Sequence, residues 1–191
     1  MSAAKKKPGP SKRATIMNAH QLQRALVRMA HEIIEQSEGA ADLALVGMQS
    51  RGVHLAERLA TFIRENTGNE IPVGSLDVTL YRDDFRSRDK APEVRPSSIP
   101  FEVDDRLLVL VDDVLFTGRT VRAALDCLMD YGRPREIHLA VVIDRGHRQL
   151  PIGADFVAQE VVTLPDQEIM VCVKEQDGED AVYLVDAPRA K

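Results

Sequence analysis

The stretch that decides the fold is Leu107–Leu125, which reads LLVLVDDVLFTGRTVRAAL. It joins a β-branched apolar run, a pair of carboxylates and a Thr-Gly-Arg-Thr turn that opens a helix. The run Leu107–Val111 is short, unbroken and apolar, which is typical of a strand buried on both faces of a parallel sheet. Asp112 and Asp113 follow at its carboxyl end, where open α/β sheets bind their ligands. The pattern therefore predicts an α/β fold with a ligand site at this strand end.

The Thr-Gly-Arg-Thr turn supplies the parts of a phosphate site. Gly118 lets the backbone turn tightly, and the hydroxyls of Thr117 and Thr120 add donors. The first N–H groups of the following helix point outward and form an anion site. Carboxylates beside a phosphate would repel it unless they bind something else, such as sugar hydroxyls or Mg²⁺. A ribose 5-phosphate offers a phosphate to the turn and hydroxyls to the carboxylates. The ligand that we predict is phosphoribosyl pyrophosphate (PRPP).

Four segments together resemble one enzyme family. Val111–Thr120, which reads VDDVLFTGRT, is similar to the PRPP loop of the type I phosphoribosyltransferases. Three further segments resemble one branch of them, the bacterial pyrimidine operon regulators that are also uracil phosphoribosyltransferases (the PyrR family): Gly47–Gly52, Asp77–Asp84 and Asp144–Arg148. The resemblance covers about Asn18 to about Val185 with all four segments in the family's order, so chance does not explain it.

The resemblance implies a fold and an activity. The fold is a central, mostly parallel sheet flanked by helices, with a small β-rich hood at roughly residues 144–187 and a mobile loop; alternating strands and helices favour the same sheet. The reaction joins uracil to PRPP with Mg²⁺ as cofactor and gives UMP and pyrophosphate. A uridine nucleotide (UMP or UTP) would also promote binding to the leader RNA of a pyrimidine operon. Family members are commonly homodimers or larger, and a cytoplasmic location is expected.

The family pattern also assigns the residues of the PRPP site. Asp112 and Asp113 bind the ribose hydroxyls, and Mg²⁺ is held mainly through the substrate near these two carboxylates. Ser50 and Arg51 form the pyrophosphate loop, and Arg51 joins the two aspartates as an expected catalytic residue. The expected PRPP-binding residues are Ser50, Arg51, Asp112, Asp113, Val114, Leu115, Phe116, Thr117, Gly118, Arg119 and Thr120.

Other roles for these residues are weaker. Asp112 and Asp113 could be acids favoured by a helix dipole, but a glycine turn separates them from the helix. A receiver-like phosphoacceptor site would need a further acidic pair after the strand Leu43–Met48, where none occurs. Arg51 could be an ordinary surface arginine on the first turn of a helix. PRPP binding stays the leading interpretation.

Two further segments complete the expected site. By resemblance Arg145 lies at the base site, where it could read the carbonyls of uracil, and the strand that contains Ile169 forms the wall of this site. Tyr81 and Arg82 begin the mobile loop, which in the family closes over the substrate and excludes water. Without the family, Tyr81 and Arg82 would be interpreted as part of a solvated turn.

Binding of a leader hairpin needs basic groups on one face of the protein. The candidates are Arg133, Arg135, His147 and Arg148. A histidine held by local hydrogen bonds is an equally good interpretation of His147. RNA-binding members usually carry an arginine and a lysine where this chain has Gly153 and Gln159, and Val162 and Leu164 interrupt a further motif. The RNA-binding motif lacks several of the family's residues, whereas the enzyme motifs are complete. Catalysis is therefore the firmer prediction.

The hydrophobic pattern predicts the order of the elements. Asn18 is a good helix N-cap with Gln21 as its capping-box partner, and apolar residues at helical spacing continue to about Gln36. The later elements are a strand at Leu43–Met48, a helix carrying Leu55, Leu59 and Ile63, a strand at Val73–Tyr81, a mobile excursion at Asp83–Pro100, the strand at Leu107–Val111, a helix to about Tyr131 and a strand at Ile137–Ile143. The predicted hood contains Phe156–Val157, Ile169–Val173 and Val182–Val185.

Composition agrees with one soluble domain. The chain has 191 residues, 44% of them hydrophobic, and no apolar run approaches the roughly 20 residues that span a membrane. Residues 1–17 form a basic tail that we expect to be disordered, and residues 18–187 form the domain. The tail could touch nucleic acid, but a solubilising role is the better interpretation. Cys127 and Cys172 show no metal spacing and fit free thiols in a reducing cytoplasm.

Two rival functions stay open. One is a nucleotide-sensing RNA attenuation protein whose catalysis is residual; the salt dependence of RNA affinity would separate it from an enzyme. The other is a purine phosphoribosyltransferase, which the fold alone does not exclude. A purine enzyme would need a different base-site segment from Asp144–Arg148.

Overall fold

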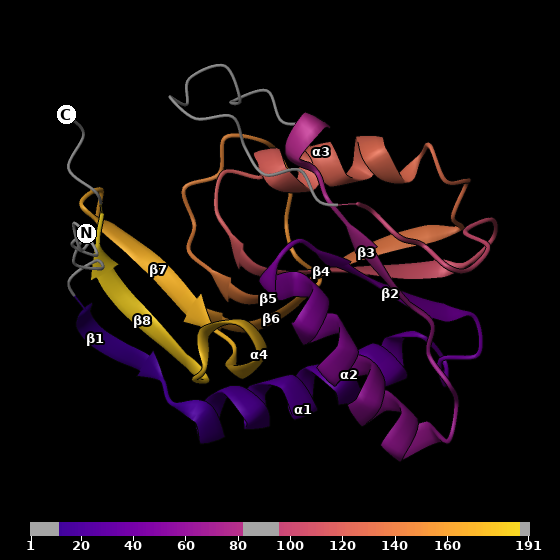
Figure 1. Cartoon of the computed structure of the whole chain (residues 1–191), viewed down its shortest axis with the longest axis horizontal. Coiled ribbons are helices and arrows are strands. Elements are labelled where there is room, and N and C mark those ends of the chain that lie inside the picture. Colours follow the sequence, from indigo (N-terminus) through magenta and orange to yellow (C-terminus); the bar gives the residue numbers. More distant parts are fainter. Residues whose placement is uncertain (1–11, 82–95, 188–191) are drawn as a thin grey trace, which may run out of the picture.

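The computed structural model describes residues 12–81 and 96–187. Its centre is a sheet of five parallel strands in the order β3-β2-β4-β5-β6 (Figure 1). These strands are β2 (Leu43–Met48), β3 (Val73–Leu76), β4 (Leu107–Leu115), β5 (Glu136–Asp144) and β6 (Phe156–Glu160). The predicted strand from Leu107 is therefore the central strand of the sheet.

Helices cover both faces of this sheet. The long helices α1 (Ala19–Gln36) and α2 (Arg51–Thr67) lie on one face, and α3 (Arg119–Leu128) lies on the other (Figure 1). Successive side chains of β4 alternate between the two layers: Val109 packs with α1 and α2, whereas Leu110 packs with α3. Because β4 is buried on both faces, its apolar residues form a continuous run.

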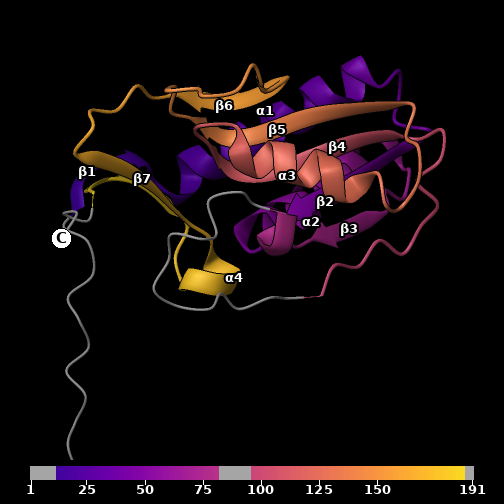
Figure 2. The same ribbon diagram turned by 90° about the horizontal axis from the view of Figure 1, so that it is seen from above.

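A second, three-stranded antiparallel sheet stands to one side of the helix–sheet–helix layers (Figure 2). Its strands, in the order β1-β8-β7, are β1 (Lys12–Met17), β7 (Gln167–Cys172) and β8 (Ala181–Asp186). The short helix α4 (Lys174–Asp177) connects β7 to β8. These elements form the hood, and the fold class predicted from the sequence is confirmed.

Local signals placed several boundaries correctly. The side chain of Asn18 accepts a hydrogen bond from Gln21 N (3.0 Å), and Asn18 N donates to Gln21 Oε1 (2.9 Å), which is the predicted capping box of α1. The helix ends at Gln36, and β2 has the predicted bounds.

Three elements differ in length from the prediction. β3 ends at Leu76 because Asp77 Oδ1 accepts a hydrogen bond from Thr79 N (2.8 Å), and this turn leads into a 3₁₀ helix at Thr79–Tyr81. β4 continues beyond Val111 to Leu115, since its last residues still pair with β5. α3 ends at Leu128, three residues early, where turns replace the helix.

Two segments lie in sheets to which the prediction did not assign them. Phe156–Val157, expected in the hood, begins β6 at the edge of the parallel sheet, with Phe156 buried opposite Ala140. Lys12–Met17, expected in the disordered tail, forms β1 along β8, and Arg13 pairs with Asp166 and Asp186 of the hood. The remaining tail residues, 1–11, lie outside the described residues.

The expected excursion at 83–100 is only partly described. Residues 82–95 lie outside the described residues, whereas Ser98 exchanges two backbone hydrogen bonds with Ser75 of β3 (2.7 and 2.8 Å). The predicted excursion to Pro100 is therefore wrong at its end, where Ser98 pairs with β3. In the two described ranges, no helix is both long and apolar enough to cross a membrane.

Candidate active site

The predicted acid pair lies near the carboxyl end of β4. Asp112 and Asp113 are half-buried, and Asp113 N donates to Asp112 Oδ1 (2.9 Å). Burial raises the pKa of Asp113, while the positive charge of Arg51 acts in the opposite direction. Arg51 starts α2 at the end of β2, so the structure brings the acid pair and the predicted pyrophosphate residue together.

The predicted PRPP loop (residues 111–120) turns sharply after β4. Gly118 has a left-handed φ of 88°, which permits the turn, and α3 begins at the next residue, Arg119. The carbonyl of Thr117 accepts hydrogen bonds from Gln149 N (3.0 Å) and Leu150 N (3.2 Å). The loop is thus fixed to the segment after β5, and the N-terminus of α3 faces the same edge of the sheet as the acids.

The N-terminus of α2 approaches the sheet unusually closely at two glycines. A Cβ on Gly47 of β2 would lie 2.3 Å from Val53 Cα, and a Cβ on Gly52 would lie 2.4 Å from the carbonyl oxygen of Val111. The connecting peptide Gln49–Ser50 is cis. The close contacts of Gly47 and Gly52 place Ser50 and Arg51 next to the carboxyl ends of β2 and β4. Arg51 forms a bidentate pair with Asp177 of α4, through Nε and Nη2 at 2.9 Å each.

The predicted base-site arginine is buried between the PRPP loop and the hood. Arg145 follows β5 and is 9% exposed. Its Nε donates to Thr163 Oγ1 (3.2 Å), its Nη2 donates to the carbonyl of Gln167 (3.0 Å), and its guanidinium carbon lies 3.9 Å from the centre of the Phe116 ring. Burial lowers the pKa of Arg145. Among the described residues, Arg145 has no carboxylate in salt-bridge contact, so its remaining donors suit neutral carbonyl acceptors.

Sequence reasoning missed the residues that hold this arginine. Thr163 is 2% exposed, and its carbonyl also contacts Nε2 of His147 (2.7 Å). Gln167 is the first residue of β7, and Ile169 lies two positions further along the same strand, half-buried. Thr163 stands alone between exposed Val162 and Leu164, so no pattern in the sequence marks it.

Of the two residues predicted to begin the loop, only Tyr81 lies in the described part of the chain. Tyr81 ends the 3₁₀ helix, and its hydroxyl donates to a carboxylate oxygen of Asp130, beyond the end of α3. This hydrogen bond raises the pKa of Tyr81. Arg82 lies outside the described residues, so its role stays a prediction.

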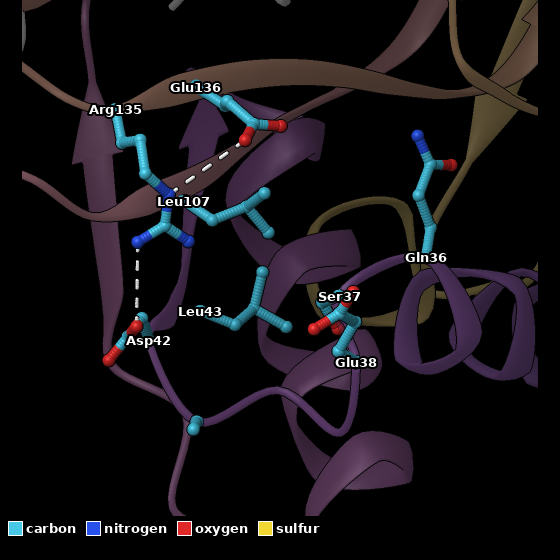
Figure 3. A pocket seen from close by; sticks show the side chains of 9 residues that line it. Gln36, Ser37, Glu38, Asp42, Leu43, Leu107, Arg135 and Glu136 are labelled. Carbon is cyan, nitrogen blue, oxygen red and sulfur yellow. Dashed lines mark hydrogen bonds and ion pairs between the residues drawn. The ribbon is translucent and has the colours of Figure 1, made fainter.

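The four candidate RNA contacts fall into two pairs at opposite ends of β5. Arg133 and Arg135 precede β5, whereas His147 and Arg148 follow it, and nine strand residues separate the two pairs by roughly 30 Å. Figure 3 shows Arg135 at a pocket of about 380 Å³ near the amino ends of the strands, where it contacts Asp42 (3.5 Å) and Glu136 (3.8 Å).

Arg148 is also committed to internal contacts. Its Nε donates to the carbonyl of Ile152 (2.8 Å), its Nη1 to the carbonyl of Phe116 (2.8 Å), and its Nη2 to Asp144. Arg148 therefore stabilises the PRPP loop through Phe116. A phosphate group of RNA would have to compete with these acceptors for the Arg148 guanidinium.

The donor set at the end of β4 fits a metal that is shared with a substrate. Among the described residues, no group of three or more histidine, cysteine or acidic side chains could hold a metal ion by itself. Asp112 and Asp113 supply carboxylate oxygens, which suit Mg²⁺, and a diphosphate ligand would supply further oxygens.

Comparison with known proteins agrees with this geometry. Residues 13–176 match the family model described as phosphoribosyl transferase domain. A protein from Thermus aquaticus named Bifunctional protein PyrR is 56% identical over 172 residues, which cover 90% of this chain and 95% of the relative. A protein of the same name from Chloroflexus aurantiacus is 55% identical, with 89% and 93% of the two chains covered. The chain belongs to the PyrR family. The family resemblance inferred from the sequence motifs is confirmed.

Solved structures similar to this PyrR family member include purine enzymes. A hypoxanthine phosphoribosyltransferase of Trypanosoma cruzi superposes with a TM-score of 0.71 at 13% identity, covering 94% of each chain. A hypoxanthine-guanine phosphoribosyltransferase of Bacillus anthracis gives a TM-score of 0.67 at 15% identity, covering 93% of this chain and 99% of the other. At such identities the similarity establishes the fold alone.

Proposed function

We propose that the protein is a cytoplasmic uracil phosphoribosyltransferase that makes UMP and pyrophosphate from uracil and PRPP. One observation carries the proposal: three strand ends bring together an acid pair, an arginine at a helix N-terminus and a buried arginine that forms no salt bridge with a carboxylate among the described residues. Membership of the PyrR family, at 50–56% identity to several relatives, supports the pyrimidine over the purine assignment.

Each part has one task in the reaction. The N1 atom of uracil forms a bond to C1 of the ribose, the bond from C1 to pyrophosphate breaks, and the N1 proton is released. Positive charge develops on the ribose, and the carboxylates of Asp112 and Asp113 stabilise that charge while they accept hydrogen bonds from the ribose hydroxyls. The PRPP loop binds the 5-phosphate and Arg51 binds the pyrophosphate. Bound Mg²⁺ would neutralise charge on the leaving group.

Arg145 supplies a reason for base choice. Its guanidinium only donates hydrogen bonds, and uracil presents two carbonyl acceptors, whereas cytosine places an amino group at one of these positions. The Phe116 ring fixes one face of the guanidinium at 3.9 Å, and hood residues fix one edge. In this proposal the backbone near Ile169 lines the other side of the base.

The direct test is UMP formation from uracil and PRPP. We expect activity with Mg²⁺, loss of activity when EDTA removes the metal, and recovery when Mg²⁺ is returned, because the pyrophosphate charge is then neutralised again. Absence of UMP at any Mg²⁺ concentration would reject the proposal.

We also propose a second role, binding of a pyrimidine operon leader RNA in the presence of UMP or UTP, for which the word bifunctional in the relatives' names is the support. Arg133 and Arg135 lie about the length of β5 away from His147 and Arg148, and Arg148 is held by internal hydrogen bonds, so these four residues offer few cations at any one place. Gln159 lines a surface pocket with Arg24 and Arg28 of α1, so a positive charge at position 159 would join two existing cations.

We therefore predict that the protein binds RNA weakly and that its RNA affinity depends little on salt. Positive charges introduced at positions 153 and 159 should change both properties. Gly153→Arg with Gln159→Lys should tighten binding and steepen the slope of log affinity against log salt by up to about 0.9 per new phosphate contact. A Cβ at position 153 would meet no atom within 4 Å, so the arginine should be tolerated.

Binding of the leader hairpin at several salt concentrations, with UMP present, provides the measurement. Gly153→Gln is the neutral control and should leave the slope unchanged. Tight binding with a steep slope in the parent protein would show that these two positions do not limit RNA affinity.

A further inference from the structure

The hood contacts α2 through two arginines that lie two helical turns apart. Arg51 pairs with Asp177 of α4, and Arg58 pairs with Glu175 (2.6 Å) and Asp180 (2.7 Å). Figure 1 shows α4 between the hood strands and α2. The acidic segment 175–180 therefore lies along the face of α2 that begins at the predicted pyrophosphate residue.

Asp177 is itself held in place. Its Oδ2 accepts a hydrogen bond from Val173 N (2.9 Å), and Val173 is fully buried. Gly178 ends α4 in a left-handed conformation, and its N–H donates to the carbonyl of Lys174 (3.1 Å). The carboxylate is thus a fixed acceptor that belongs to the fold of the hood and not a freely moving side chain.

The pairing uses only one edge of the Arg51 guanidinium. Nε and Nη2 meet the two oxygens of Asp177 at 2.9 Å each, in the bidentate arrangement that fixes the plane of an arginine. Among the described residues, no hydrogen bond uses Nη1. The side chains of Arg51 and Asp177 are 29% and 20% exposed, so water screens this pair only in part.

Arg51 also lies close enough to Asp113 for the two charges to interact. The charge of Asp113 contributes to the raised pKa of Arg51, after the larger contribution of the hydrogen bonds to Asp177. Arg51 also precedes Gly52, which packs against Val111 and Asp112 of β4. The guanidinium therefore stands between the hood and the end of β4, where the proposed reaction releases pyrophosphate.

We propose that Asp177 is a positioning residue for the proposed transferase reaction: it holds the Nε–Nη2 edge of Arg51 so that the Nη1 edge meets the pyrophosphate group. The inference rests on the proposed function. It makes the hood part of the pyrophosphate site as well as of the base site. A fixed guanidinium needs no further ordering when the diphosphate binds, which is the reason for an effect on affinity.

The test compares Asp177→Ala with the parent enzyme. We expect the KM for PRPP, and the KM for pyrophosphate in the reverse reaction with UMP, to rise roughly tenfold. The KM for uracil should stay within about twofold, since Arg145 is untouched. Asp177→Asn keeps one acceptor for Arg51 without the charge and should give intermediate values, which also covers the case in which the alanine variant folds poorly.

Glu175→Ala is the matched control. It removes an acidic partner of Arg58 from the same short helix, so it loosens the same contact without touching Arg51. We expect parental KM values for it. An equal rise in this variant would show that docking of the hood alone matters, and would overturn the proposal.

A lower or unchanged KM for PRPP in both Asp177 variants would also overturn it, since Asp177 would then compete with pyrophosphate or have no effect. UMP formation by the parent tests the proposed function separately. Titration calorimetry with pyrophosphate and Mg²⁺ gives the same ratio of variant to parent affinity without any base. A roughly tenfold weaker Kd in Asp177→Ala supports the inference even if uracil is not the substrate, and an unchanged Kd rejects it.

Discussion

Replacing Asp112 and Asp113 together with asparagine should lower the rate of UMP formation by roughly 10³-fold or more. Two full negative charges disappear from the place where positive charge develops on the ribose, while the shapes of the side chains are kept. Asparagine can still offer Oδ1 to the N–H of residue 113, which Asp112 contacts now (2.9 Å).

The same double variant should remain folded. Burial raises the pKa of Asp113, so the folded state disfavours its ionised form at neutral pH relative to the unfolded chain. Removal of that charge should not lower the free energy of unfolding. Asp126→Asn, which removes an exposed partner of Arg122 on α3, is the control and should retain the parental rate. Full activity in the double variant would remove both aspartates from the proposed mechanism.

Gly52→Ala should lower the stability of the fold substantially. The new Cβ would lie 2.4 Å from the Val111 carbonyl oxygen and 3.3 Å from Asp112 Cα, and both are backbone atoms of the central strand. Alanine favours a helix over glycine by about 1 kcal/mol, but overpacking of this kind costs about 3 kcal/mol or more. We expect a net loss of about 2 kcal/mol in the free energy of unfolding.

Urea unfolding measures this loss. Gly153→Ala is the matched control, because a Cβ at position 153 has no atom within 4 Å, and its free energy of unfolding should stay within about 0.5 kcal/mol of the parent. An equally small effect of Gly52→Ala would mean that α2 can move away from β4 at little cost.

The sequence predicted the elements whose signals are local. The capping box at Asn18 and the apolar runs of β2 and β4 depend on neighbouring residues, and the structure places them as expected. The order of the motifs also placed Asp113 and Arg51 at carboxyl ends of strands. Parallel pairing then brings those ends to one edge of the sheet.

The remainder depends on contacts between distant parts of the chain. Nothing near Thr163 or Asp177 indicates that each holds an arginine from another segment. The basic residues before Met17 favoured a disordered tail, so β1 was not predicted. Its partner β8 lies at the other end of the sequence. The separation of Arg135 from His147 could have been predicted from the sequence. The predicted strand between these two residues puts them at opposite ends of that strand.

The central claim is that the base is uracil. Its most direct test is the turnover of uracil, hypoxanthine and guanine, each at the same concentration with PRPP and Mg²⁺, in parallel reactions. We predict that uracil is converted to UMP and that both purines react at least roughly 10²-fold more slowly, because the donors of Arg145 suit the two carbonyls of uracil, whereas each purine has only one carbonyl. Turnover of hypoxanthine or guanine at a rate equal to or above that of uracil would contradict the account.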